Sequence, residues 1–273
     1  MNALRLRWRG LILAVMAYLA CRIFLVAADE PTLSKDQIKQ FLLTAKVVKS
    51  KQSDKGITNP WRLTLSDGTI THDASFQKVD EHKINAQLGT GTEMNFVDSY
   101  KYNIAAYTLA EMLDMDNMLP VYVERRWQGD PGSLSWWLPV KMDEVQRHRQ
   151  NIAPPDPDAW NNQMYKIRVF DQLVYDSDAN LTNVLIGENW QIWRGDFTRA
   201  FRLFGNLKNA GDLEHCDRHL LEKLRALDGK ELQEKTKHYL TKDEVKAVMQ
   251  RRDKIVEQFQ KLIAEKGEAA VLY

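Results

Sequence analysis

The sequence predicts an α+β fold with two unequal lobes. Strand signals and one strong helix fill the first half of the chain after its N-terminal segment, and helical periodicity dominates after Phe201. Between these halves lies a short apolar hairpin framed by Asp178, Asn183 and Asp196. A chain of 273 residues, 44% of them hydrophobic, is long enough to bury a substantial core. We therefore expect a small strand-rich N-lobe with one key helix, a larger helical C-lobe, and a site between them.

Residues 1–28 form a segment of a different kind. An apolar run from Leu11 to Ala28 ends in small residues and follows three arginines, which is the layout of a signal peptide: Arg5, Arg7 and Arg9. Arg22 interrupts the run. An uncleaved membrane anchor is the alternative, since the run approaches the length of a membrane span, and a lipidated Cys21 is a third possibility. We expect an exported protein, periplasmic or extracellular, or one anchored to the membrane through residues 11–28.

Cleavage after Ala28 would change the charge of the chain. It would remove four arginines and no acidic residue, so the net charge of +1 would become −3. A slightly acidic domain without a basic patch predicts no nucleic-acid partner. Only Cys216 would remain of the two cysteines, which excludes an intrachain disulfide in the mature protein.

The first half of the mature chain is predicted to be mostly strands. Alternation and turn signals place a hairpin around Ser66-Asp67-Gly68, and an alanine- and leucine-rich stretch predicts one helix. The expected elements are a helix over 33–50, strands over 61–65 and 69–78, a polar loop over 85–97, a helix over 98–113, and strands over 120–127 and 133–140. We divide this region into an N-terminal helix and linker, residues 29–56, and an N-lobe, residues 57–140.

The remaining residues, 141–273, are predicted to form the C-lobe. Three prolines mark residues 151–158 as a connector, and a helix is expected over 160–175. After Phe201 we expect helices over 216–227, 229–240 and 241–266. The last of these begins with a capping box made by Thr241 and Glu244, and apolar residues at helical spacing give it a buried stripe.

The hairpin between the lobes predicts a metal site. Val184-Leu185-Ile186 and Gln191-Ile192-Trp193 read as two strands joined by the turn Gly187-Glu188-Asn189. A residue just before the first strand and one just after the second lie at the same end of such a hairpin, so Asn183 and Asp196 should be neighbours. Asp178 lies on the preceding loop. Two carboxylates and an amide oxygen suit Mg²⁺, which prefers oxygen ligands and leaves positions for phosphates.

These residues resemble the atypical branch of the protein-kinase-like superfamily, which includes HipA-like kinases, phosphatidylinositol 3/4-kinases and secretory-pathway casein kinases. Asp178-Ala-Asn-Leu-Thr-Asn183 is similar to that branch's Asp-Arg-His-x-x-Asn loop. Gly195-Asp-Phe-Thr-Arg-Ala-Phe201 is similar to its Ile-Asp-His-Gly-Arg-Ala-Phe segment. Tyr100-Lys-Tyr-Asn-Ile-Ala-Ala-Tyr107 resembles its Glu-Ile-Ala-Ala-Tyr helix. The resemblance covers about residues 57–205 and implies a two-lobed kinase-like fold, here in an exported bacterial member.

The resemblance also implies roles for single residues. Asp178 would be the catalytic carboxylate, and Asn183 and Asp196 would hold Mg²⁺ or Mn²⁺ against the phosphates of ATP or another nucleotide. Lys78 would be the phosphate-pairing lysine, with Lys83 as its substitute. Asn103 falls where the branch has the helix glutamate that pairs with this lysine, so we place all three in the nucleotide-binding set.

Three departures from the branch's pattern bear on activity. Asn103 cannot form an ion pair, although Glu93 or Glu111 would be alternative partners outside the motif position. Ala179 replaces an arginine, and Thr198 replaces a glycine whose backbone conformation the motif uses. No clear nucleotide-binding glycine loop is present in the sequence.

The sequence leaves three functions open. The first is a metal-dependent phosphotransferase that moves a nucleotide phosphoryl group to a hydroxyl of a protein, lipid or small molecule. The second is a catalytically impaired kinase-like module that binds a nucleotide or a partner. The third is a transferase on the same fold that moves a whole nucleotidyl group.

Overall fold

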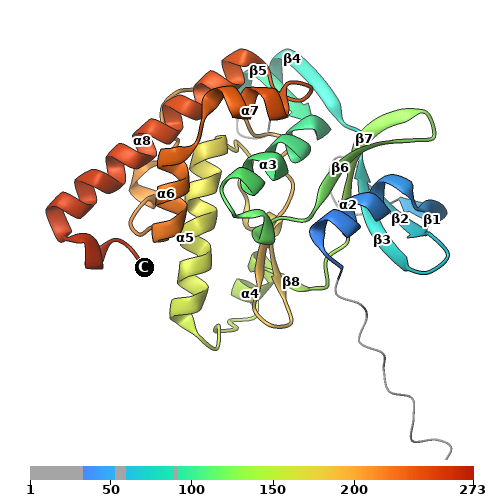
Figure 1. Ribbon diagram of the computed structural model, residues 1–273, viewed down its shortest axis with the longest axis horizontal. Coiled ribbons are helices and arrows are strands. Elements are labelled where there is room, and N and C mark those ends of the chain that lie inside the picture. Colours follow the sequence, from blue (N-terminus) through green and yellow to red (C-terminus); the bar gives the residue numbers. More distant parts are fainter. Residues whose placement is uncertain (1–32, 53–59, 89–90) are drawn as a thin grey trace, which may run out of the picture. The chain divides into compact units, whose positions relative to one another are not determined.

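The computed structural model describes residues 33–52, 60–88 and 91–273, and Figure 1 shows their arrangement. The chain divides into two compact units, residues 1–37 and 38–273. Only residues 33–37 of the first unit are described, so the fold that follows is that of the second. The expected signal or anchor segment, residues 1–28, lies outside the described residues.

A five-stranded antiparallel sheet forms the first part of the second unit. Its strands are β1 (Lys46–Gln52), β2 (Trp61–Ser66), β3 (Thr71–Gln77), β6 (Tyr122–Trp127) and β7 (Asp130–Trp136), in the order β1-β2-β3-β7-β6. Alternate residues of the central strands point to one side and are buried, among them Leu63, Leu65, Ala74, Phe76 and Leu134. This alternation is the sequence signal that predicted the β2–β3 hairpin.

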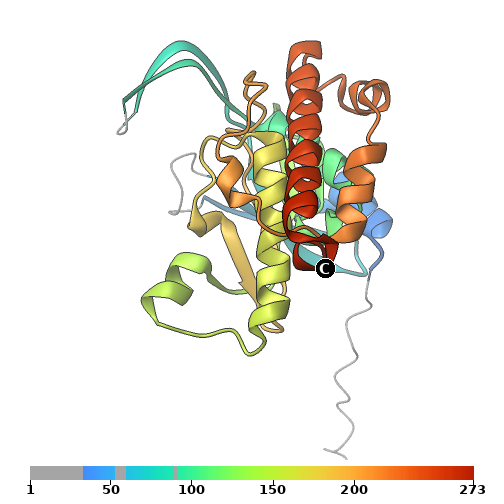
Figure 2. The same ribbon diagram turned by 90° about the vertical axis from the view of Figure 1, so that its left-hand side faces the viewer.

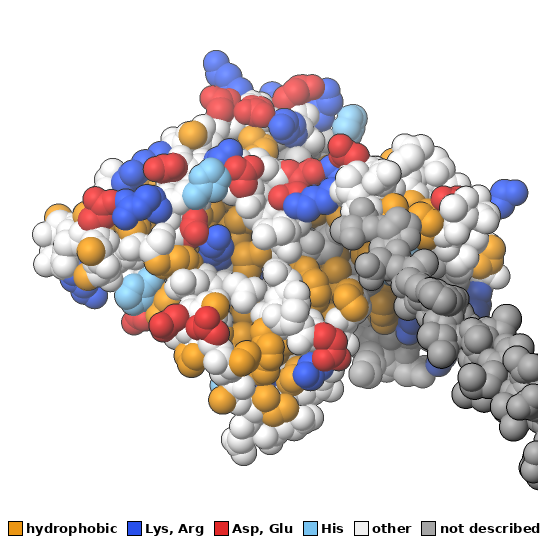
Figure 3. All heavy atoms as spheres, turned by 60° about the horizontal axis from the view of Figure 1, so that its bottom comes forward, with side chains coloured by type: hydrophobic (Ala, Val, Ile, Leu, Met, Phe, Trp, Pro, Cys, Tyr) orange, Lys and Arg blue, Asp and Glu red, His pale blue; other side chains and the backbone are white. Residues whose placement is uncertain are grey.

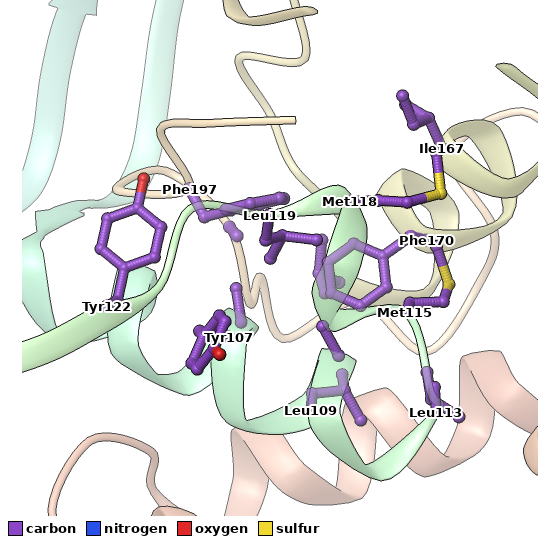
Figure 4. Packing of buried hydrophobic residues seen from close by; sticks show 14 of the residues in the cluster. Tyr107, Leu109, Leu113, Met115, Met118, Leu119, Tyr122, Ile167, Phe170 and Phe197 are labelled. Atoms are coloured by element: carbon purple, nitrogen blue, oxygen red, sulfur yellow. The ribbon is translucent and has the colours of Figure 1, made fainter. Parts of the chain in front are cut away.

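Helix α3 (Tyr100–Met112) packs on this sheet against β6 and β7. It begins where the sequence predicts, because the hydroxyl of Ser99 caps it by accepting a hydrogen bond from the backbone N–H of Lys101. Its apolar residues are buried all round, since a second set of helices covers the face that the sheet leaves open. Figure 4 shows Leu109, Leu113 and Met115 around Phe170 of the C-terminal half.

A long β-ribbon stands where the sequence predicted a loop over 85–97. Strands β4 (Asp80–Leu88) and β5 (Gly91–Ser99) pair antiparallel with each other and with no other described strand. Figure 2 shows the ribbon as a curved arch. The loop expectation was wrong because most of its residues are exposed on both faces, so no alternation of apolar and polar residues marks the strands.

The predicted helix over 33–50 is also corrected. It ends early as α2 (Lys35–Thr44), and the chain continues as strand β1 (Lys46–Gln52), paired with β2. Val47 and Val48 are β-branched and favour a strand. The backbone N–H and C=O groups of these residues then form hydrogen bonds with β2, in place of the hydrogen bonds that they would form within a longer helix.

The second part of the unit is mainly helical, as expected. It contains α4 (Glu144–Arg149), α5 (Pro157–Val174), α6 (Arg218–Ala226), α7 (Gly229–Thr236) and α8 (Lys242–Lys266). In Figure 1, α5 lies beside α8, and α6 and α7 pack on α8 as well. The predicted capping box of α8 is present, with Thr241 and Glu244 exchanging side-chain to backbone hydrogen bonds. Its apolar stripe is buried, which confirms the predicted inward face.

A three-stranded sheet, β8 (Val140–Asp143), β9 (Val184–Gly187) and β10 (Ile192–Arg194), joins the two halves in the order β10-β9-β8. The mixed architecture, a small antiparallel sheet followed by helices, confirms the expected α+β class. On the face shown in Figure 3, positive and negative side chains are intermingled over the surface. No helix among the described residues combines the length and apolar character of a membrane span.

Candidate functional site

The predicted hairpin forms and brings two of the expected site residues together. Strands β9 and β10 pair so that Arg194 lies opposite Val184, and the backbone N–H of Gly195 donates to the carbonyl oxygen of Asn183 at 3.0 Å. Asn183 therefore immediately precedes β9 at the end of the hairpin where Asp196 follows β10. The sequence placed these residues correctly because a two-stranded hairpin leaves little freedom in its register.

The carboxylate of Asp196 is held in a defined position. Its residue has a left-handed backbone, with φ of 56°, which Asp tolerates better than most residues. Its N–H donates to the hydroxyl of Tyr122 at 3.3 Å, and the hydroxyl of Thr198 donates to its Oδ1 at 3.1 Å. Thr198, which replaces the glycine of the motif, therefore supports the carboxylate of Asp196 through its hydroxyl.

Asp178 lies on the loop that leads into the hairpin. Its N–H donates to Oδ1 of Asp176 at 2.9 Å, and its own carboxylate is exposed. Burial raises the pKa of Asp176, and the negative charges of Asp196 and Asp178 raise it further. Asp176 therefore contacts the backbone of Asp178 directly, and it pairs with Arg194, whose guanidinium also donates to the carbonyl oxygen of Asp196.

A buried arginine joins this loop to the segment of Asp196. The guanidinium of Arg194 is 1% exposed and contacts the carboxylates of Asp176 and Asp171. It also donates to the carbonyl oxygen of Gly195. Burial disfavours its charge, but the two carboxylates more than offset this and raise its pKa. Arg194 thus places a positive charge behind the Asp178 loop, although Ala179 stands where the motif has an arginine.

Sequence reasoning missed Arg194, although a signal was available. In a strand, residues two apart share a face, so Arg194 points the same way as the fully buried Ile192. A charged residue on the buried face of a short strand requires a carboxylate partner. Asp171, Asp176 and Asp178 are the acidic residues that lie shortly upstream of the hairpin in the described chain, and the first two are the partners of Arg194.

Asn103 is fully buried in α3 and ties three elements together. Its Oδ1 accepts a hydrogen bond from the N–H of Phe197 at 2.7 Å. Its Nδ2 donates to Oε1 of Gln77 at 2.7 Å and to the hydroxyl of Ser133 at 3.2 Å. Asn103 therefore fixes the backbone immediately after Asp196 to strands β3 and β7. The partner of Asn103 on β3 is an amide and carries no charge.

In the structure, Lys78 and Lys83, the two lysines expected to bind phosphate, form ion pairs away from Asn103 and Asp196. Lys78 is 55% exposed and forms an ion pair with Asp130 at 2.6 Å. Lys83 is 53% exposed and pairs with Glu81 of the same ribbon at 2.6 Å. Neither of the alternative glutamates meets these lysines, because Glu93 pairs with Arg199 and Glu111 with Lys39. A phosphate-binding role for Lys78 or Lys83 stays a prediction.

Asp98, at the end of β5, is a site residue that the sequence did not indicate. Its Oδ1 is buried and has no hydrogen-bond partner in the described chain. Burial raises its pKa, a hydrogen bond with Thr198 opposes this, and the charge of Asp196 adds to the increase. The neighbouring N–H of Ser99 donates to the carbonyl oxygen of Thr198 at 2.8 Å, which fixes β5 against the Asp196 segment.

The residues present fit a magnesium or manganese ion. A buried carboxylate oxygen without a partner is costly unless a cation or donor satisfies it, and Asp98 carries such an oxygen on the strand that Ser99 fixes to the Asp196 segment. Among the described residues no group of three or more His, Cys, Asp or Glu side chains could hold a metal. An ion here would therefore rely on two carboxylates, the amide oxygen of Asn183, water and substrate phosphates, a donor set that hard cations accept.

A cavity of about 560 Å³ lies next to the Asp178 loop. Ala179 and Asn180, which directly follow Asp178, form part of its wall, and α5 forms another part. Its charged lining residues are of both signs: Arg168, Asp171, Asp176, Lys208, Asp212 and Glu214. The cavity therefore suits a polar ligand better than an apolar one.

Comparisons with known proteins support the fold. The chain matches no protein-family model and no curated protein in sequence. In structure it is similar to Fam20 of hydra, solved with sugar, with a TM-score of 0.65 and 15% identity over 87% of this chain and 91% of that one. It is also similar to the Golgi casein kinase with Mn and ADP bound, with a TM-score of 0.60 and 14% identity over 87% of this chain and 78% of that one.

A bacterial structure gives a weaker match. The proinflammatory kinase CtkA of Helicobacter pylori has a TM-score of 0.52 and 8% identity, over 83% of this chain and 97% of that one. At such identities the likeness concerns the fold. The chain shares an α+β, kinase-like fold with these structures, and this is the fold that the resemblance in its motifs implied.

Proposed function

We propose that the chain is a metal-dependent phosphotransferase of the atypical kinase-like class. The observation that carries the proposal is the junction at the open end of the β9–β10 hairpin, where Asn183 and Asp196 meet and Arg194 ties them to the Asp178 loop. A nucleotide, ATP or another, would donate the phosphoryl group. The Golgi casein kinase structure that resembles this chain holds Mn and ADP, which supports a nucleotide and a divalent cation as cofactors.

Each residue has a separate task in this proposal. Asp98, Asn183 and Asp196 would hold Mg²⁺ or Mn²⁺, which when bound neutralises charge on the transferring phosphoryl group. Asp178 would orient the acceptor hydroxyl. The hydroxyl oxygen attacks the terminal phosphorus, the bond from that phosphorus to the bridging oxygen breaks, and the nucleoside diphosphate leaves. The hydroxyl proton passes to the carboxylate of Asp178.

The acceptor is proposed to be a polar hydroxyl compound or a protein. The cavity beside Ala179 and Asn180 lies next to Asp178 in the chain and carries charged groups of both signs. Such a lining favours hydrogen-bonding ligands over a lipid tail. Hydroxyl-bearing sugars, short peptides and lipid headgroups are the probes with which to survey it.

A second candidate function is a binding module without transfer activity. The observation that favours it is the neutral Gln77–Asn103 pair, since kinases place a Lys–Glu ion pair between the corresponding strand and helix. Metal-dependent stabilisation by nucleotide without any turnover would support this function. Nucleotidyl transfer, the third possibility, would add a whole nucleotide to the acceptor and would show in the product mass.

The test is a transfer assay on the full chain. Incubation with γ-labelled ATP and Mn²⁺ should give a labelled product, either on the protein itself or on a surveyed acceptor. Asp196→Ala should abolish the label, and Asp253→Ala, an exposed acid on α8, should leave it unchanged. Equal label in wild type and Asp196→Ala would refute the assignment. Label in neither, with nucleotide binding intact, would favour the binding module.

The location of the protein is also proposed, because the expected signal or anchor lies outside the described residues. We propose export or anchoring through residues 11–28. A C-terminal reporter that is active on only one side of the membrane tests this. A cytoplasmic signal without membrane association would rule out both.

A further inference from the structure

Two arginines follow Asp196 closely and share one carboxylate. Arg199 and Arg202 both form an ion pair with Glu93 of strand β5. The Nη2 atom of Arg202 lies 2.5 Å from Oε1 of Glu93, and Arg199 contacts Oε2. The side chain of Arg202 is 7% exposed and that of Arg199 is 18% exposed. The ring of Phe96 lies beneath both guanidinium groups, at 5.0 Å and 5.9 Å from their central carbons. The β-ribbon thus closes over a pair of nearly buried cations.

The charges of this group do not balance. Two positive side chains face one negative side chain, and the Nε atoms of Arg199 and Arg202 are buried without a hydrogen-bond partner. Burial lowers the pKa of Arg202, the charge of Glu93 opposes this, and the charge of Arg199 lowers it further. Unsatisfied buried guanidinium N–H groups are unfavourable. An additional anion with several oxygen atoms would satisfy them better than the single carboxylate of Glu93.

The pair lies beside the candidate transfer site. Ser177, which precedes Asp178, donates to the carbonyl oxygen of Arg199 through its N–H at 3.2 Å and its hydroxyl at 3.0 Å. The same hydroxyl accepts a hydrogen bond from Arg202 at 3.2 Å. Arg199 also lies 5.0 Å from the ring of Phe96, two residues before Asp98 on β5, so this arginine packs on the strand that carries a candidate metal carboxylate.

A phosphoryl-transfer site needs positively charged side chains that bind the donor phosphates. However, Gln77 and Asn103 are neutral, and Lys78 and Lys83 are exposed and paired elsewhere. Arg194 is occupied by Asp171 and Asp176. Within the described ranges, Arg199 and Arg202 are the cations held against both the Asp178 loop and the Asp196 segment. Arginine is suited to this task because its fork of N–H groups binds phosphate oxygens in pairs.

We propose that Arg199 and Arg202 form the phosphate-binding site for the donor nucleotide, and that Glu93 is an internal ligand which the phosphate displaces. This inference rests on the proposed phosphotransferase function. It moves the phosphate-binding charge from the sheet, where kinases carry it, to the segment that follows Asp196. Glu93 then competes with the nucleotide for the same guanidinium groups. The side chain of Glu93, on the β4–β5 ribbon, must move away from both arginines when the nucleotide binds.

The experiment measures the affinity of the full chain for inorganic tripolyphosphate, and separately for ADP with Mn²⁺, by calorimetry. Glu93→Gln should bind tripolyphosphate about tenfold more tightly than wild type, because the competing charge is gone. Arg199→Gln should bind it about tenfold more weakly. The control is Glu188→Gln, which removes an exposed carboxylate that pairs with Lys141 and should change neither affinity.

Arg202 is almost buried, so Arg202→Gln can fail to fold. Arg202→Lys keeps the charge but loses the fork, and it should weaken tripolyphosphate binding while its melting curve stays cooperative. Arg199 is more exposed than Arg202. If both Arg202 variants are unstable, the tripolyphosphate affinity of Arg199→Gln alone tests the proposal.

The outcomes separate this inference from the proposed function. Equal tripolyphosphate affinity in wild type, Glu93→Gln and Arg199→Gln would overturn the arginine site even if ADP binds, and so would an absence of binding in all of them. The expected ranking for tripolyphosphate, with no binding of ADP and Mn²⁺ to wild type, would uphold the anion site and reject the nucleotide-dependent function.

Discussion

The two sides of the candidate site are built from different chemistry. On the hairpin side, the buried guanidinium of Arg194 contacts the carboxylates of Asp171 and Asp176 and the backbone carbonyl oxygen of Asp196. On the sheet side, Gln77 and Asn103 form a neutral amide contact. The hairpin side carries the groups that we propose to bind a cation and to orient a hydroxyl. The sheet side carries uncharged groups, and Asn103 fixes the backbone after Asp196 by a hydrogen bond to Phe197. Charge and positioning are therefore supplied by different sides of the site.

The largest effect is expected where the charged side is broken. Arg194→Met leaves Asp171 and Asp176 buried without their cation, and loss of one partner of a buried ion pair costs about 3–5 kcal/mol. Urea unfolding of the variant should show this decrease. The control is Arg218→Ala, whose ion pair with Glu268 is half exposed and should be worth less than about 1 kcal/mol. Equal small losses in both variants would show that the Arg194 network does not stabilise the fold.

The charged side should also respond to pH. Burial, opposed by Arg194 and assisted by Asp176, raises the pKa of Asp171 to about 6 from 3.8. A raised carboxyl pKa means that the folded state binds the proton more tightly than the unfolded state. The contribution of Asp171 to stability is therefore full below about pH 4 and is lost as the pH rises toward 6, by at most about 3 kcal/mol.

Asp171→Asn isolates this contribution. The free energy of unfolding of wild type should fall between pH 4 and 6 relative to that of the variant, in denaturant titrations at matched ionic strength. Parallel pH curves for the two proteins would show that Asp171 has an ordinary pKa in the folded state.

On the neutral side, Asn103→Ala should cost about 1–3 kcal/mol, because it leaves the N–H of Phe197 and the amide of Gln77 without their partner. If nucleotide turnover is present, it should fall further than stability predicts, since Asp196 precedes the freed backbone. Ser135→Ala, on the same strand as the Ser133 partner of Asn103, is the control for a general loss at β7. Unchanged turnover in a folded Asn103→Ala protein would show that Asn103 does not position Asp196.

A smaller effect is expected when charge is placed on the neutral sheet side, at Gln77 and Asn103. The double variant Gln77→Lys with Asn103→Glu places an ion pair where the amide contact lies. It should change the affinity for ADP with Mn²⁺ by much less than the factor of about ten that one charge-assisted phosphate contact gives, because we place the phosphates at Arg199 and Arg202. Each single variant, which introduces one uncompensated charge, should be less stable than the double variant. A gain of about tenfold in the double variant would mean that the phosphates bind beside the sheet.

The smallest effect is expected for Lys78→Ala. Its ion pair with Asp130 is about half exposed on both sides, so stability should change by less than about 1 kcal/mol. Nucleotide affinity should not change either. A strong loss of affinity would return Lys78 to the phosphate-binding role that its sequence position implies, and would require the side chain to turn toward Asn103.

Much of the candidate site was predictable because it is local. The β9–β10 hairpin, the meeting of Asn183 with Asp196, the cap of α3 and the capping box of α8 each depend on residues close together in the chain. The β4–β5 ribbon was missed for a related reason. Its strands are exposed on both faces, and without a buried face the sequence shows no periodicity.

What the sequence by itself determined is which chemical groups the site has and the fold class that presents them. Only the tertiary structure decided which charges meet. Asn103 reaches Gln77 across 26 residues, and Arg199 reaches Glu93 across 106. Such contacts depend on the packing of whole elements. Successive side chains of a strand point to opposite faces, so the neutral Gln77 and not the neighbouring charged Lys78 faces α3. The physical reason is that local patterns set the backbone, whereas the partners of a side chain follow from how distant segments fold together.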